Sequence, residues 1–146
     1  MEYVMGKKEN LEGVLRLLEQ LNESETPAID FDYGIRIWNY IETHNIKYIL
    51  AKENNNIIGL CYLCVIPNLT HSGKSIGLIR HLIIDKNHRQ KGIGKKLMEK
   101  TIEYAKECNC YKVIIQSGIE REVAHKFYEK LGFDGKSKKA FELRLE

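Results

Sequence analysis

The strongest constraint on the fold is a strand that is apolar at almost every position and runs into a glycine-containing loop and a helix. Residues 76–85, IGLIRHLIID, consist mainly of isoleucine and leucine. Such a strand is typical of a sheet that is covered on both faces, because neither face has to meet water. The chain is therefore expected to place helices on both sides of a central sheet.

Hydrophobic periodicity predicts the other elements. An N-terminal helix should bury one face, made of Leu11, Val14, Leu15, Leu18 and Leu21. After a break at 23–28, a second helix should bury Phe31, Ile35, Trp38 and Ile41. Later helices are expected from Ile93 to Cys108 and over 121–133, where Val123, Phe127 and Leu131 should face inward. Strands are expected over 46–52, 57–66, 76–85, 111–117 and 139–146.

The predicted order is ααβββαβαβ in one domain spanning 1–146. This order indicates an α/β fold (α+β by some schemes) with a single mixed sheet, an antiparallel N-terminal half and helices on both faces. The length suits one domain, and the net charge of +3 is too small to imply a nucleic-acid partner. No apolar run has membrane-spanning length, and the N-terminus lacks the core of a signal peptide. The expected location is the cytoplasm, with no membrane partner.

The four cysteines do not suggest a metal site. Cys61 and Cys64 form a C-x-x-C pattern inside a predicted strand, where residues three apart point to opposite faces. Cys108 and Cys110 have no set of histidines spaced around them. Buried, reduced thiols are the expected state, and no metal is predicted.

The stretch HRQKGIGKKLMEK, 88–100, has the chemistry of a phosphate site. The first turn of a helix carries unpaired N–H groups and a partial positive charge, and glycine lets an anion approach the backbone. Lysines and an arginine add positive charge. The P-loop pattern fails at Arg89 and Lys96, and the dinucleotide-binding pattern G-x-G-x-x-G fails at Leu97. The pattern [RQ]-x-x-G-x-[GA] fits 89–94 completely.

In this respect the chain resembles the GCN5-related N-acetyltransferases. Their central motif is a buried strand, then [RQ]-x-x-G-x-[GA], then a helix, which here is HLIIDKNHRQKGIGKKLMEKTIEYA (81–105). AHKFYEKLGF (124–133) is similar to a later helix of the family. The order of elements also agrees over nearly the whole chain. The segment CVIPNLTHSGKS is longer than usual and resembles small bacterial members of the family.

The resemblance implies acetyl-CoA as the cosubstrate of an N-acetyltransferase. The backbone amides of Gln90 to Lys95 would hold its pyrophosphate, and the strand at Leu82–Ile84 would bind the pantetheine arm. A backbone N–H there, that of Leu82, would polarise the thioester carbonyl. The cofactor-binding residues implied are Leu82, Ile83, Ile84, Arg89, Gln90, Lys91, Gly92, Ile93, Gly94, Lys95 and Ser117.

The same resemblance implies Tyr128 as the acid that protonates the leaving thiolate, and the alternative role for Tyr128 is a core tyrosine. The base is open. Many members carry a Glu near the position of Arg80, and this chain departs from that pattern. His81 has a suitable intrinsic pKa, Asp85 is a second candidate with a turn role as its alternative, and a water chain is a third.

The acceptor is expected to be a small-molecule or peptide amine. In this family it lies between the N-terminal helices and the strands, where the chain offers acids and aromatics that could hold a cation or simply form a helix face: Asp30, Asp32, Tyr33, Trp38, Tyr40 and His44. A homodimer is common among relatives. The alternative function is a non-catalytic acyl-CoA-binding or sensing domain, and nucleic-acid binding through RQKGIGKK is disfavoured by the modest charge.

Overall fold

The computed structural model describes residues 1–21 and 29–146, and the chain divides into two compact units, 1–114 and 115–146. The break predicted over 23–28 lies outside the described residues. That 1–146 forms one functional domain stays a prediction.

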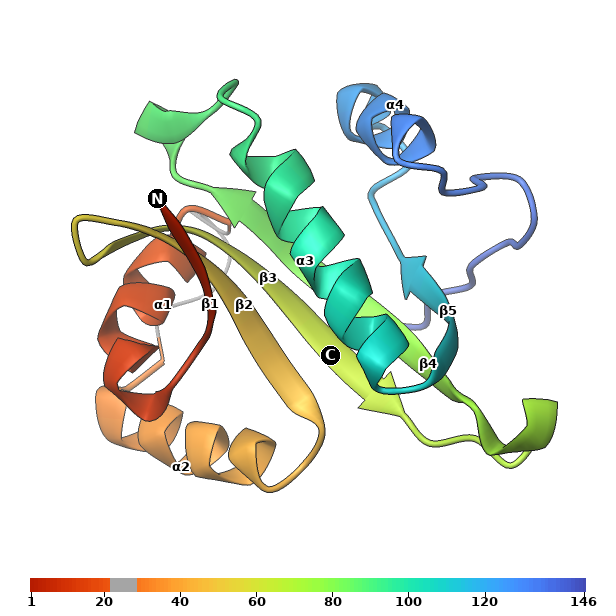
Figure 1. The fold of residues 1–146 in the computed structure, drawn as a ribbon, viewed down its shortest axis with the longest axis horizontal. Helices are drawn as coiled ribbons and strands as arrows, with labels where there is room; N and C mark the ends of the chain where they lie inside the picture. The colour runs from red at the N-terminus through yellow and green to blue at the C-terminus, as the bar shows by residue number, and fades with distance from the viewer. Residues whose placement is uncertain (22–28) are drawn as a thin grey trace. The chain divides into compact units, whose positions relative to one another are not determined.

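The first unit is built around a mixed sheet (Figure 1). Its strands lie in the order in which they occur in the chain, and β1 to β4 are antiparallel neighbours, as predicted for the N-terminal half. The bounds are Glu2–Met5 for β1, Ile46–Glu53 for β2, Asn56–Ile66 for β3, Ser75–Ile84 for β4 and Cys110–Ile115 for β5.

A two-residue turn joins β2 to β3. Asn54 and Asn55 both have positive φ, 51° and 65°, which is the backbone geometry of a tight hairpin turn that matches the twist of its strands. Glu53 and Asn56 pair across the start of the hairpin. The turn thereby fixes the position of the Glu53 side chain, which takes part in the site described below.

Helices cover both faces of the sheet. On one face, α1 (Leu11–Leu18) packs Val14 and Leu17 against Leu50, Leu60 and Ile83. Beside it, α2 (Phe31–Glu42) buries Trp38 and Ile41 together with Leu11 of α1.

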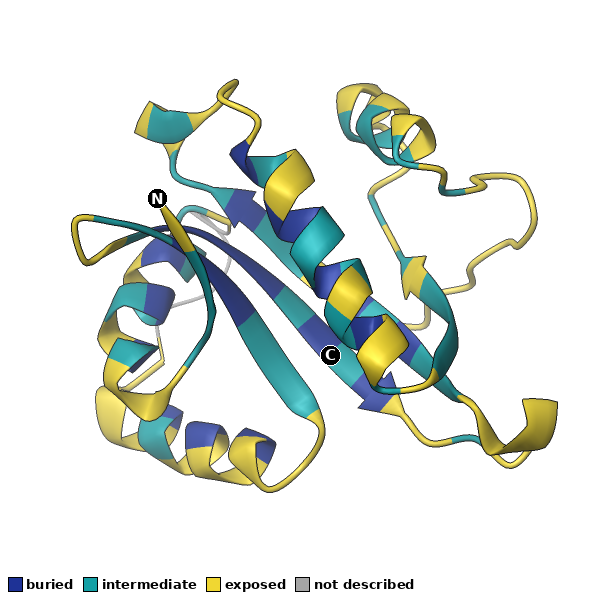
Figure 2. Cartoon of the chain, viewed as in Figure 1, coloured by how far each residue is buried: buried dark blue, intermediate teal, exposed yellow. Residues whose placement is uncertain are grey.

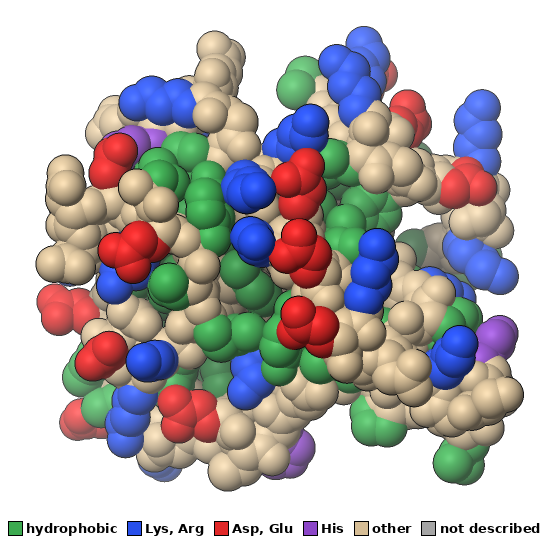
Figure 3. Space-filling view, viewed as in Figure 1, with side chains coloured by type: hydrophobic (Ala, Val, Ile, Leu, Met, Phe, Trp, Pro, Cys, Tyr) green, Lys and Arg blue, Asp and Glu red, His purple; other side chains and the backbone are tan. Residues whose placement is uncertain are grey.

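The other face is covered by α3, Ile93–Glu107, which lies in front of the sheet in Figure 1. A Cβ added to Gly59 of β3 would come within 2.9 Å of the Leu97 side chain, so this helix packs closely on the sheet. Buried and exposed residues alternate along α3 in Figure 2, because one side of the helix faces the strands and the other faces solvent. Figure 3 shows Lys and Glu side chains interleaved along its outer side, where Lys100 and Glu103 pair at 3.2 Å.

Several details of the predicted pattern are wrong. The sequence analysis missed β1, because a four-residue strand gives little periodicity. Phe31 and Leu21 were expected in the core, but they are 48% and 38% exposed. In α1 the buried position is Leu17 rather than Leu18, because the apolar face of the helix is centred on Leu11, Val14 and Leu17.

The second unit contains the end of β5 and α4, Glu122–Lys130. Val123 was expected to face inward but is 85% exposed. The predicted strand over 139–146 is also wrong: it pairs with none of the described strands, and Phe141, Leu143 and Leu145 are exposed. Alternating apolar residues form a stable strand only where a neighbouring strand takes up their hydrogen bonds and a packed layer buries one face.

Candidate active site

The loop that leads into α3 leaves its backbone open. From β4 the chain makes one 3-10 turn at Lys86–His88 and starts the helix at Ile93. Gly92 precedes the helix with φ of 77°, and a Cβ added there would meet no atom within 4 Å. Gln90 also has a positive φ, 64°. Glycine tolerates this conformation without strain and leaves the neighbouring amides free of side-chain cover.

Within the described part of the chain, the backbone N–H groups of residues 89–95 are unpaired. None of them donates to an acceptor among the described residues, and the first such bond of the helix runs from Lys96 N to Gly92 O at 3.2 Å. The side chains of Lys91 and Lys95 are exposed beside them. Unpaired N–H groups at a helix start carry partial positive charge and bind phosphate oxygens. The loop has the donors and the open space that a pyrophosphate requires.

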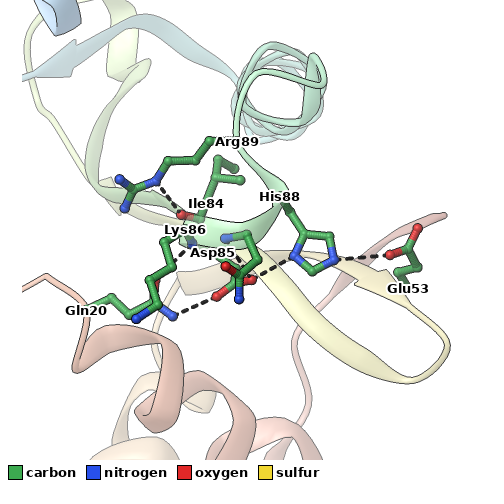
Figure 4. A network of polar contacts seen from close by, with 8 residues as sticks. Gln20, Glu53, Ile84, Asp85, Lys86, His88 and Arg89 are labelled. Carbon is green, nitrogen blue, oxygen red and sulfur yellow. Dashed lines mark hydrogen bonds and ion pairs between the residues drawn. The ribbon is translucent and has the colours of Figure 1, made fainter.

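A polar network holds the start of this loop (Figure 4). The carboxylate of Asp85 accepts from Gln20 Nε2 at 2.8 Å and contacts His88 Nδ1 at 2.7 Å. The other ring nitrogen of His88, Nε2, lies 3.3 Å from Glu53 of the hairpin. Gln20 also accepts from Lys86 N at 3.1 Å. The loop is thereby attached both to the segment that follows α1 and to the β2–β3 hairpin.

The network shifts the acidity of its central group. The hydrogen bond from Gln20, followed by that from His88, holds the pKa of the Asp85 carboxyl below its ordinary value. Asp85 was considered as a base, but these partners stabilise its ionised form and make it a poor proton acceptor. Sequence reasoning missed Gln20, Glu53 and His88, because Gln20 lies 65 residues from Asp85 and no local pattern links them.

Arg89 makes a contact that the sequence did not predict. Its Nε donates to Ile84 O at 3.1 Å, so the side chain folds back onto the end of β4. The rest of the guanidinium is exposed. Arg89 therefore links the loop to the strand, in addition to bringing positive charge to the loop.

β4 carries an irregularity at the point where the resemblance places the reacting thioester. Leu60 pairs with Ile83 and Tyr62 with Arg80, so His81 and Leu82 together lie opposite Cys61. This is a β-bulge, and His81 has a φ of 54° there. A non-glycine residue in this region is uncommon and is found disproportionately at functional sites.

The strand also extends beyond its neighbour. Ser75 N donates to Asn109 O at 3.1 Å, so β4 and β5 begin side by side. Because β4 has ten residues and β5 has six, Leu82–Ile84 lie past the end of β5. Among the described residues, Arg89 Nε donates to Ile84 O on that edge, and the rest of the backbone of Leu82–Ile84 is open there to pair with an extended ligand, as an added strand would.

The His81 side chain is half-buried beside an aromatic ring. Its ring centroid lies 5.8 Å from that of Tyr62 in an edge-on arrangement. Burial lowers the pKa of His81, and the positive charge of Arg80 lowers it further. Both effects favour the neutral imidazole, which is the form that accepts a proton.

Ser117 and Tyr128 belong to the second unit. The Ser117 hydroxyl is buried without a hydrogen-bond partner among the described residues. The Tyr128 ring makes edge-on contacts with Phe127 and Phe133, at 5.5 Å and 6.0 Å between centroids. His125, between them in sequence, contacts Gly118 O through Nε2 at 2.8 Å. The roles of Ser117 and Tyr128 at the thioester stay predictions.

Comparison with known proteins settles the family. The sequence pattern of the Acetyltransferase (GNAT) family matches residues 11–133. The chain belongs to this family. A glucosamine 6-phosphate N-acetyltransferase from Trypanosoma brucei brucei is 30% identical to this GNAT chain over 138 residues, covering 91% of the chain and 88% of that protein.

Two further GNAT comparisons agree. A glucosamine 6-phosphate N-acetyltransferase from Arabidopsis thaliana is 29% identical over 128 residues, covering 86% of the chain and 83% of that protein. A solved structure from Agrobacterium tumefaciens superposes with a TM-score of 0.91 at 26% identity, with 99% of each chain covered. The family and the fold class expected from the motif are confirmed, and the chain is an N-acetyltransferase.

Two further observations concern membrane spans and metal sites among the described residues. None of their helices is long and apolar enough to cross a membrane. Within 1–21 and 29–146, no group of three or more His, Cys, Asp or Glu side chains is placed to hold a metal ion.

Proposed function

We propose that the protein transfers the acetyl group of acetyl-CoA to a primary amine by direct attack in a ternary complex. The observation that carries this proposal is the run of unpaired backbone N–H groups at 89–95 around an open Gly92. A pyrophosphate supplies acceptors for such donors, and the exposed Lys91 and Lys95 add attraction at longer range.

The bulged end of β4 supports the placement of the rest of the cosubstrate. The backbone edge of Leu82–Ile84 lies directly before the loop in sequence, and Arg89 takes up the Ile84 carbonyl. An extended pantetheine arm could pair with the rest of this edge while the pyrophosphate binds at 89–95. The N–H of Leu82, next to the bulge, would then donate to the thioester oxygen as negative charge develops on it.

The chemistry needs two proton transfers. His81, whose lowered pKa favours the neutral imidazole, would accept a proton from the ammonium form of the acceptor, directly or through water, so that the neutral amine attacks the thioester carbonyl. Tyr128 would give its proton to the departing sulfur, a role that rests on the family motif. One C–N bond forms and one C–S bond breaks, so an amine and acetyl-CoA become an acetamide and free CoA.

The proposal is tested by measuring release of the CoA thiol from acetyl-CoA across a broad panel of amines. We expect turnover of at least one amine class. Tyr128→Phe should lower kcat by about 10-fold to 100-fold with acetyl-CoA affinity unchanged, and His81→Ala should flatten the acidic limb of the pH–rate profile. Tight binding of acetyl-CoA with no release of CoA by any amine would instead indicate a non-catalytic acyl-CoA-binding domain.

A further inference from the structure

Three side chains form a row across the sheet, on the face that α1 and α2 cover. Tyr48 of β2 pairs with Tyr62 of β3, and Tyr62 pairs with Arg80 of β4. Paired residues of neighbouring antiparallel strands have their side chains on the same face and in contact. The two tyrosine rings meet edge-on at 5.3 Å, and Trp38 of α2 stacks on Tyr48 at 5.7 Å.

The cover over this row ends before Arg80. Trp38 is 3% exposed and Tyr48 is half-buried beneath it, whereas Arg80 is exposed. The neighbouring β4 residue on this face, Ile83, is buried under Val14 and Leu17 of α1. The row therefore runs from a packed end at Trp38 to an open end at Arg80, beside His81 at the bulge.

Arg80 has no partner among the described residues. It makes no ion pair and no hydrogen bond there, in contrast to Arg16 and Arg144, which pair with glutamates, and to Arg89, which bonds a backbone carbonyl. The acid of α2 that lies near the row, Glu42, accepts the indole N–H of Trp38 at 2.7 Å. Within 1–21 and 29–146, the positive charge of Arg80 is thus uncompensated at the open end.

The electrostatics of the row agree with this picture. Burial, with a smaller contribution from Tyr62, raises the pKa of Tyr48 to about 12, while the charge of Arg80 acts in the opposite direction. The pKa of Tyr62 is raised mainly by burial, again with Arg80 opposing. No described Asp or Glu contributes to the shifts of Tyr48, Tyr62 or His81. Neither tyrosine hydroxyl has a hydrogen-bond partner among the described residues, and that of Tyr62, next to Arg80 in the row, can serve a ligand.

We propose that the Arg80 surface, formed by Tyr48, Tyr62, Arg80 and His81, binds an acceptor amine that carries an anionic group, a phosphate or a carboxylate. This inference rests on the proposed function and names the acceptor class for it. The guanidinium of Arg80 would bind the anion through paired N–H donors, and the Tyr62 hydroxyl would donate to it. The rings would pack against the body of the acceptor, which places its amine toward His81 and the end of β4.

Charge complementarity decides between acceptor classes. An uncompensated arginine beside the bulge would repel a polyamine or a peptide lysine, and it would attract an amino sugar phosphate or an amino acid carboxylate. The sign of the charge at position 80 therefore bears on which amines the enzyme accepts.

The test compares matched amines in the CoA-release assay: glucosamine 6-phosphate against glucosamine, an amino acid against its amide, and spermidine as a cationic amine. We expect higher kcat/KM for the anionic member of at least one pair. Arg80→Gln should reduce that preference by about 10-fold to 100-fold, and Arg80→Lys should restore part of it. Arg36→Gln is the matched control: Arg36 is an exposed arginine that lies over the Tyr33 ring, and its loss should leave the preference unchanged.

The outcomes separate this inference from the proposed function. Preference for spermidine or for the neutral members, or an anion preference that survives Arg80→Gln, would overturn the inference while acetyl transfer stands. If no amine is turned over, binding of glucosamine 6-phosphate and of inorganic phosphate is measured by titration calorimetry. Equal affinity for wild type and Arg80→Gln, or no binding to either, would overturn the inference. Failure of acetyl-CoA to bind would count against the proposed function alone.

Discussion

The two loops that flank β4 use the same turn chemistry in different ways. The loop before the strand has a 3-10 turn at His71–Gly73, and the loop after it has one at Lys86–His88. Each contains a glycine with φ of 77° that faces open space, Gly73 in the first and Gly92 in the second. From residue types alone, either could have been the anion-binding loop.

Their backbone donors differ. In the first loop Gly73 N donates to Thr70 O and Lys74 N to His71 O, so its amides are used within the turn. In the second, the amides of 89–95 donate to no described acceptor, and side chains from distant elements hold the loop instead. To bind an anion, a glycine loop needs unpaired N–H groups and contacts that hold the loop in place. Of these two loops, the second has both properties among the described residues.

The largest expected difference between the two loops is in how replacing the glycine of each loop changes CoA binding. Valine at either position adds the same strain, because both have the same positive φ and no neighbour for a Cβ. Gly92→Val should weaken CoA binding by about 10-fold to 100-fold, since the side chain blocks the approach of the pyrophosphate to the amides. Titration calorimetry with CoA measures this.

Gly73→Val is the control for that substitution. It should cost similar stability in thermal unfolding and leave CoA affinity unchanged. Equal CoA affinity for both variants would remove the distinction between the two loops.

A smaller effect is expected from the network that holds the second loop. Asp85→Ala removes the acceptor shared by Gln20 and His88 and should lower the free energy of unfolding by about 1–3 kcal/mol, because hydrogen bonds to a charged group are lost. It should also weaken CoA binding by about 3-fold to 10-fold, since the loop has to be ordered on binding.

His71→Ala in the first loop removes a stacking contact with Tyr111, at 4.0 Å between centroids, and a hydrogen bond of 3.0 Å between Nδ1 and Thr70 Oγ1. It should not change CoA affinity. Chemical denaturation and CoA titration of both variants provide the comparison. Undiminished CoA affinity in Asp85→Ala would show that the network is not needed for binding.

Replacing one lysine in each loop should give a smaller difference in CoA affinity. Lys91→Gln should reduce CoA affinity by about 2-fold to 5-fold at low salt, because an exposed charge near a phosphate contributes little and is screened. Lys74→Gln, equally exposed in the first loop, should have no effect. Affinities at two salt concentrations test this, and a loss for Lys91→Gln that is independent of salt would argue against a charge effect.

The smallest expected effect is a change of stability with pH that is confined to acidic pH. Hydrogen bonds from Gln20 and His88 lower the pKa of Asp85 below its ordinary 3.8, so the folded state holds this proton less tightly than the unfolded chain. The stability from Asp85 is complete above pH 3.8 and is lost as pH falls through the lowered value. An NMR titration of the carboxyl should show a midpoint below 3.8 that rises in Gln20→Ala; a midpoint at or above 3.8 in wild type would contradict the network.

The sequence predicted those features that depend on neighbouring residues. The buried strand at 76–85, the glycine loop and α3 follow one another, and their periodicity and turn residues are visible over about 30 residues. The antiparallel strands before them were predicted for the same reason. The strand over 139–146 was wrong because alternation alone cannot show whether a partner strand exists.

Features that depend on the fold could not be predicted. His81 was named as a candidate base, but the bulge that gives it a positive φ follows from the pairing of β3 with β4. The link from Gln20 through Asp85 and His88 to Glu53 joins residues that only the tertiary structure brings together. The row from Tyr48 to Arg80 likewise depends on strand register.

The most direct test follows backbone amide signals by NMR while CoA is added to the isotopically labelled protein. The amides of 89–95 should show the largest shifts, those of Leu82–Ile84 should follow, and the amides of 71–74 in the first loop should not move. Saturable binding that shifts the 71–74 amides, or any other region, while the signals of 89–95 stay in place would contradict the assignment of the second loop as the pyrophosphate site.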